Sequence, residues 1–157
     1  MKVIKRCLMI TTWVIGATLG NAMAGEASDA VELTRSVIQV ERKAVVAKAM
    51  ELTQQESQAF WPVYNEYWNN LNKINDRKVK LIMDYAKNYG NISDTMAKDM
   101  LKEFFDIQSA TLKLKKKYVK KFENVLSPKK VFRYFQTENK LDALINIQLA
   151  SEIPLMR

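Results

Sequence analysis

LTQQESQAFW at residues 52–61 and LSPKKVFRYF at residues 126–135 are two stretches that share one pattern, placed 74 positions apart. In each stretch a leucine and a hydroxyl residue come first, and two adjacent aromatic residues come last. Thr53 and Ser127 have the short side-chain oxygen that accepts a hydrogen bond from a free amide in the first turn of a helix. Both stretches therefore predict the start of a helix.

Neighbouring residues support the two helix starts. Glu56 completes a capping box with Thr53, and Pro128 suits the first position of a helix, where no amide hydrogen is needed. Two ordinary N-caps would account for these residues. The matching leucines, Leu52 and Leu126, and the aromatic pairs at the same offset favour a degenerate internal repeat.

Residues 1–24 have the features of an export signal. Three basic residues near the start precede an apolar run at 7–20, and small residues end at Ala24, where we expect cleavage. A transmembrane helix is the alternative, but a span needs about 20 apolar residues. This run is shorter and is interrupted by Gly16 and Gly20. We therefore expect an exported chain with a single domain at residues 25–157.

The composition excludes several classes of function. The chain has no histidine, and its one cysteine, Cys7, lies in the predicted signal, so we expect no metal site and no cofactor. Nucleophile motifs and glycine-rich phosphate loops are missing, which predicts that the protein is not an enzyme. The formal charge of +8 falls to +5 without the three basic residues of the signal. That charge suits acidic or unfolded polypeptides or an anionic membrane surface, and an exported protein does not normally meet nucleic acid.

Glycine and proline are rare after residue 25, and apolar residues recur every three or four positions, which predicts an all-α fold. Gly90 is expected to end one helix in the left-handed conformation, and Ser93 to cap the next. Pro62 predicts either a kink or a short helical turn followed by a new start. We expect four helices, at 29–50, 54–89, 94–125 and 128–150.

The helix expected at 94–125 carries a continuous apolar stripe on one face. Within it, Met96 and Met100 are one turn apart and predict core packing, with an adaptable binding spot or a soft copper site as the alternatives. The stripe consists of Met96, Met100, Phe104, Ile107, Thr111, Leu114, Tyr118, Phe122 and Val125.

The expected helix lengths bear on the shape of the domain. At 1.5 Å per residue, the helices at 54–89 and 94–125 would be about 54 and 48 Å long. A compact domain of this size has a radius of gyration near 14 Å. We therefore expect an elongated four-helix protomer with a long antiparallel hairpin, which dimerises because it cannot cover both of its faces.

Two groups of residues are candidates for binding a partner. The first is a lysine cluster near the end of the third helix, which either complements the helix dipole as a solvated face or attracts acidic partner chains. The second comes from the aromatic pairs, because two adjacent aromatic residues cannot share one helix face. The candidate residues are Lys113, Lys116, Lys117, Lys120, Lys121, Trp61 and Tyr134.

With the signal, the helices and the two repeated starts, the chain resembles the periplasmic LTxxQ family of Spy- and CpxP-like stress chaperones. Leu52-Thr53-Gln54-Gln55-Glu56 matches the first motif except for its final glutamate. Leu126-Ser127-Pro128-Lys129-Lys130 stands at the second, with serine for threonine and lysine for glutamine. The resemblance covers nearly all of residues 25–157 in helix order and spacing.

The resemblance implies a cradle-like dimer in the periplasm that binds unfolded or stress-damaged envelope proteins without ATP. An accessory regulator that binds the periplasmic domain of a membrane stress sensor, either a sensor kinase or an anti-sigma factor, is the alternative. Some relatives bind zinc through histidines and cysteines, and this chain lacks those residues after Cys7. Zinc binding is therefore not expected.

Overall fold

The computed structural model describes residues 40–155, which contain four helical segments and no strand. The described part of the chain is therefore all-α, as predicted. The predicted export signal at 1–24 and the beginning of the first expected helix lie outside the described residues. The segments are a helix that covers residues 40–50, α3 (Gln54–Asn88), α4 (Asp94–Glu123) and α5 (Pro128–Glu152).

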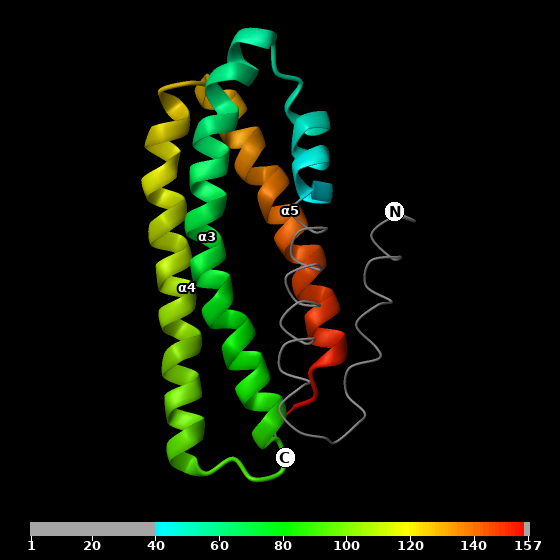
Figure 1. Cartoon of the computed structure of the whole chain (residues 1–157), viewed down its shortest axis with the longest axis vertical. Coiled ribbons are helices and arrows are strands. Elements are labelled where there is room, and N and C mark those ends of the chain that lie inside the picture. The colour runs from blue at the N-terminus through cyan, green and yellow to red at the C-terminus, as the bar shows by residue number, and fades with distance from the viewer. Residues whose placement is uncertain (1–39, 156–157) are drawn as a thin grey trace, which may run out of the picture. The chain divides into compact units, whose positions relative to one another are not determined.

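The chain divides into two compact units between Ala49 and Met50, and α3, α4 and α5 all belong to the second unit, Met50–Arg157. Within this unit α3 and α4 lie against each other and run in opposite directions, joined by residues 89–93 (Figure 1). The chain then turns again, so that α5 runs in the same direction as α3. With 35 residues, α3 is about 52 Å long.

All three expected N-caps are present. The Thr53 hydroxyl accepts a hydrogen bond from the Glu56 amide at 3.2 Å, and the Glu56 carboxylate accepts one from the Thr53 amide at 2.8 Å. Ser93 and Ser127 accept from the amides three residues later in the same way. Pro128 occupies the first turn of α5. The residues that predicted the helix starts therefore form them.

The alternative of a new helix start at Pro62 and the expectation of a left-handed Gly90 are wrong, whereas the kink at Pro62 stays a prediction. The helix α3 continues through Pro62, so no new helix starts there. Gly90 does not have a positive φ, and α3 ends instead at Tyr89, with φ −46° and ψ −37°. The Asn91 amide donates to the Asn88 carbonyl at 2.8 Å. This tight final turn gives a carbonyl group at the end of α3 its hydrogen bond, so the helix ends without a left-handed residue.

An aromatic core fills one half of the second unit. Tyr64 and Tyr67 of α3 are buried there, and the ring centroids of Phe122 and Tyr134 are 4.6 Å apart. Phe60 stacks against Phe122 at 5.4 Å and lies edge-on to Tyr134 at 5.5 Å. Rings in such tilted and edge-to-face arrangements contribute about 0.5–1.5 kcal/mol per pair beyond their buried area. The core therefore joins all three helices.

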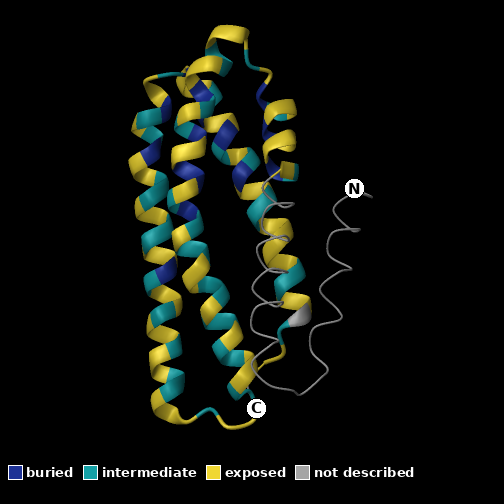
Figure 2. Ribbon diagram, in the orientation of Figure 1, coloured by how far each residue is buried: buried dark blue, intermediate teal, exposed yellow. Residues whose placement is uncertain are grey.

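We call this half of the unit the capped half, since it holds the caps Thr53 and Ser127. It comprises residues 54–71, 107–123 and 128–138. The other half, which we call the distal half, comprises residues 72–88, 94–106 and 139–151. Every buried residue of α3, α4 and α5 lies in the capped half, and none of the described residues of the distal half is buried (Figure 2).

Candidate functional site

The candidate lysines lie on a segment of α4 that has a single sign of charge. Between residues 107 and 122, α4 contains six lysines and no acidic residue. The helix begins at the Ser93 cap with Asp94 in its first turn and ends with Lys120 and Lys121 in its last. Acidic and basic residues at these ends stabilise the helix dipole.

Four of these lysines form an outward face of α4, which we call the lysine face. At 3.6 residues per turn, their positions fall within an arc of about 100°. The buried residues Ile107, Tyr118 and Phe122 lie on the other side of the helix. All four lysines are exposed, and none of them forms an ion pair among the described residues, although Lys117 contributes to the lowered pKa of Glu66. The lysine face consists of Lys113, Lys116, Lys117 and Lys120.

Lys121 differs from the other candidates, because it already has a partner. Its ammonium group lies 2.6 Å from the Glu66 carboxylate of α3 and 5.0 Å from the centroid of the Tyr118 ring. The hydrogen bond from Lys121 lowers the pKa of Glu66. Lys121 therefore joins α4 to α3, whereas the four lysines of the lysine face form no ion pair among the described residues.

A second feature of α4 was not found from the sequence. Leu101, Phe105 and Leu112 are each more than half exposed, and Val119 is half-buried. These four residues, which we call the apolar row, lie on the flank of α4 between its buried face and the lysine face. The spacing of seven residues from Phe105 to Leu112 and from Leu112 to Val119 was available as a signal. The core stripe of the same helix has a more regular spacing, and it was the only apolar stripe predicted there.

The structure corrects one aromatic candidate. Tyr134 has no exposed surface and packs between Phe60, Tyr64 and Phe122, so it cannot contact a partner. Trp61 is half-buried and donates from its indole nitrogen to the Ser57 hydroxyl at 2.9 Å. Part of Trp61 therefore remains accessible.

The motif residues lie together at the capped end. Leu126 is buried and Leu52 is half-buried. Lys130 forms an ion pair with Glu56, and these two residues occupy equivalent positions in the two copies of the motif. The hydrogen bond from Lys130 is the main cause of the lowered pKa of Glu56. The two copies thus bind each other and have a structural role in this unit.

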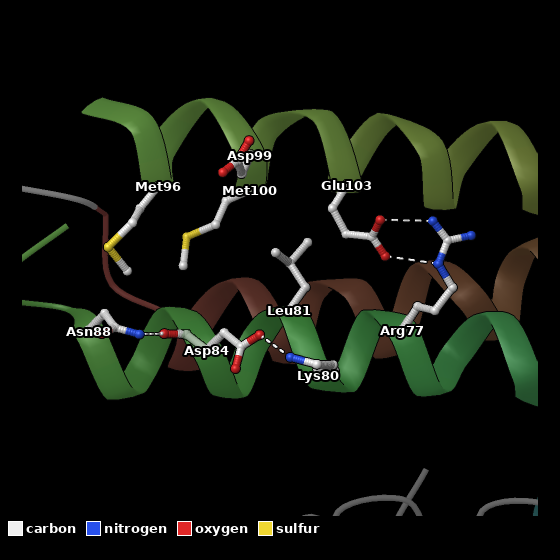
Figure 3. Close-up of a pocket in the computed structure, with 9 residues that line it drawn as sticks. All are labelled: Arg77, Lys80, Leu81, Asp84, Asn88, Met96, Asp99, Met100 and Glu103. Carbon is white, nitrogen blue, oxygen red and sulfur yellow. Dashed lines mark hydrogen bonds and ion pairs between the residues drawn. The ribbon is translucent and has the colours of Figure 1, made fainter. Parts of the chain in front are cut away.

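An open groove of about 360 Å³ lies between α3 and α4 in the distal half. Met96, Met100 and Leu81 point into it, and the ion pair between Arg77 and Glu103 lies at one end (Figure 3). The two methionines are therefore neither core residues nor fully exposed. Such a groove has room for a small apolar group.

Among residues 40–155, no group of three acidic, histidine or cysteine side chains is placed to hold a metal ion. No helix in the same part of the chain has both the length and the hydropathy to cross a membrane. No family model, no curated protein and no solved structure matches the chain.

Proposed function

We propose that the protein is a periplasmic, ATP-independent, chaperone-like protein that binds unfolded or stress-damaged envelope proteins. One observation supports this most strongly, namely the apolar row and the lysine face side by side on α4. A single exposed apolar residue is normal on a protein surface. A row of exposed apolar residues beside unpaired cations is typical of an interaction surface.

The two parts of this surface have different roles in the proposal. The lysine face attracts acidic client segments at long range and increases the rate of encounter. The apolar row then contacts the apolar side chains that an unfolded client exposes. Because the row is shallow and has no deep pocket to anchor a side chain, binding is weak and dissociation is fast.

The proposal includes a cradle-like homodimer of elongated hairpin protomers, as the resemblance to the LTxxQ family implies. Two observations support it. The distal half has no buried residue, and α5 exposes Phe132, Leu144 and Ile147. A second copy would cover this apolar area. Size-exclusion chromatography with light scattering should give twice the protomer mass, and a monomer at micromolar concentration would contradict the dimer.

Aggregation of a reduced, unfolded model protein, followed by light scattering, tests the chaperone proposal. We expect the protein to suppress scattering at several-fold excess. Replacing the four lysines of the lysine face by glutamine should weaken suppression, as should 0.5 M salt, at which charges are screened within about 5 Å.

The matched control replaces Lys73, Lys87, Lys129 and Lys140 by glutamine, because these lysines are also exposed but lie on α3 and α5. The control should behave as the wild type, and circular dichroism checks that both variants fold. A wild-type protein without any suppression would contradict the proposal. One saturable membrane partner in a pull-down, together with no such activity, would favour the accessory regulator instead.

Export is tested separately. Fractionation of the producing cell should place the protein in the periplasm, and N-terminal sequencing should find Gly25 as its first residue. A chain that retains Met1 in the cytoplasm would contradict both the localisation and the proposed clients.

A further inference from the structure

The apolar row has the spacing of a helix-packing seam. Phe105, Leu112 and Val119 are seven residues apart, and Leu101 precedes Phe105 by four. Helices that pack side by side have apolar residues at two positions of each heptad. The row fills one of these positions in three successive heptads, and Leu101 fills the other once, where Gln108 and Lys115 follow it. Nothing in the described part of the second unit covers Leu101, Phe105 and Leu112, which remain more than half exposed. The row thus lacks a partner helix.

The charges beside the row indicate the chemistry of that partner. Lys102 and Lys116 border the outer side of the row, at the positions from which coiled-coil helices pair with charges on the opposite helix. Lys98 lies seven residues before Phe105, at the N-terminal end of the row itself. Lys102 is bound to Asp106 at 2.8 Å, whereas Lys98 and Lys116 have no ion-pair partner among the described residues. Carboxylates on the partner would complement these lysines.

The position of the row on the flank of α4 suits a single helix. The lysine face is the outermost part of α4, and the row lies on the flank below it. On the inner side of the row, the Lys115 ammonium group binds Asp142 of α5 at 2.8 Å. A helix, about 10 Å wide, can lie along the flank and contact both the row and the lysines.

We infer that the flank of α4 is a docking site for an acidic amphipathic helix of a polypeptide client. The client helix lies along the apolar row, places its own apolar stripe on Phe105 and Leu112, and directs its carboxylates toward Lys98 and Lys116. This inference rests on the proposed function, since it names the class of client segment that the protein selects.

Fluorescence anisotropy with labelled 21-residue peptides tests the inference. The first peptide has leucine at a and d positions with glutamate beside them, the second has lysine in place of glutamate, and the third is a scrambled form of the first. We expect the first peptide alone to bind. The double variant Phe105→Gln/Leu112→Gln should weaken its binding about tenfold or more, which corresponds to about 1.4 kcal/mol. Lys116→Glu should weaken it less.

Met83→Gln provides the matched control, because Met83 is 55% exposed, as Leu112 is, but lies on α3. It should leave binding unchanged. Equal binding of the basic or scrambled peptide would overturn the inference, and so would an unchanged affinity of the double variant. All substituted side chains are exposed, and circular dichroism verifies that the variants fold.

Two further measurements identify other occupants of the row. If the double variant turns a dimer into a monomer, a second copy covers the row and the inference is wrong. If it abolishes binding to vesicles of anionic phospholipid while the acidic peptide does not bind, the partner is a membrane and the inference is wrong. Wild-type protein that suppresses aggregation but does not bind the acidic peptide would refute only the inference. Peptide binding without suppression would refute only the proposed chaperone function.

Discussion

Phe104 and Phe122 show how the two halves of the second unit differ. They are 18 residues apart on α4, which is five turns, so they lie on the same face of one helix. Phe122, in the capped half, has no exposed surface and contacts rings from α3 and α5, whereas Phe104, in the distal half, is 46% exposed. Two residues of the same type on the same helix face therefore differ, because one belongs to the core and the other to the surface.

The contacts that hold the distal half are mainly polar. Arg77 binds Glu103, Lys78 donates to Asn146 at 2.9 Å, and the Tyr85 hydroxyl donates to the Pro154 carbonyl at 2.8 Å. None of these groups is fully buried, so each hydrogen bond contributes only about 0.5–1.5 kcal/mol. We infer that the capped half supplies most of the stability of the unit.

Replacing each phenylalanine by alanine should give the largest contrast. Phe122→Ala removes a fully buried ring and should lower the free energy of unfolding by about 3–5 kcal/mol. Phe104→Ala, the matched control on the same face, should cost about 1 kcal/mol, since much of its ring is already in water. Urea unfolding followed by circular dichroism measures both. Equal losses would show that the distal half has a core of its own.

The sequence could predict the elements but not this contrast. Thr53, Ser93 and Ser127 fixed the helix starts, because a cap depends only on residues within one turn. Phe104 and Phe122 belong to one uninterrupted apolar stripe, and nothing local distinguishes them. Their different burial follows from where the side chains of α3 and α5 reach α4, which is a property of the tertiary structure.

The same reason explains the errors at the candidate site. In the pair Tyr134-Phe135 one ring had to face inward, and the sequence did not indicate that it was Tyr134. In the sequence nothing distinguishes Lys121 from the neighbouring lysines, and its ion pair with Glu66 depends on how α3 packs against α4. The lysine face was recognisable from spacing alone, because exposed positions on a helix follow from its period and need no partner.

Removing the helix caps at the two ends should give the next largest difference in the free energy of unfolding. Ser127→Ala removes a cap from the capped half and should lower the free energy of unfolding by about 1 kcal/mol. Ser93→Ala removes the equivalent cap at the distal end and should have a smaller effect, because the first turn of α4 can open there without disturbing buried residues. Hydrogen exchange should show faster exchange in that turn only. A larger loss for Ser93→Ala would contradict the comparison.

The loss of an ion pair should change the free energy of unfolding by a smaller amount, and should differ less from one pair to the other. Lys115 and Asp142, at the border of the halves, are both largely shielded from solvent, so Lys115→Met should cost up to about 1 kcal/mol. Lys80 and Asp84 form an exposed pair within one turn of α3, and Lys80→Met should cost about 0.3 kcal/mol. Thermal unfolding at low and high salt measures both. An effect of Lys115→Met that is no larger than that of Lys80→Met would show that the border pair is open in solution.

The stability contributed by one carboxylate in each half should depend on pH in the same way. The pKa of Glu56 is lowered by Lys130 and by the Thr53 amide in the capped half, and the pKa of Glu103 is lowered by Arg77 in the distal half. A lowered pKa means that each ionised carboxylate stabilises the fold above the ordinary value of 4.5, and that this contribution is lost as the pH falls through the lowered pKa.

Carboxyl titration by NMR should therefore find both pKa values below 4.5. Lys130→Met should raise only that of Glu56, and Arg77→Met only that of Glu103. If Glu103 instead titrates at an ordinary pKa while Glu56 does not, the distal ion pair does not form in solution, and α3 and α4 separate at that end. If both pKa values are lowered, both ion pairs form in solution, and apolar burial alone distinguishes the two halves.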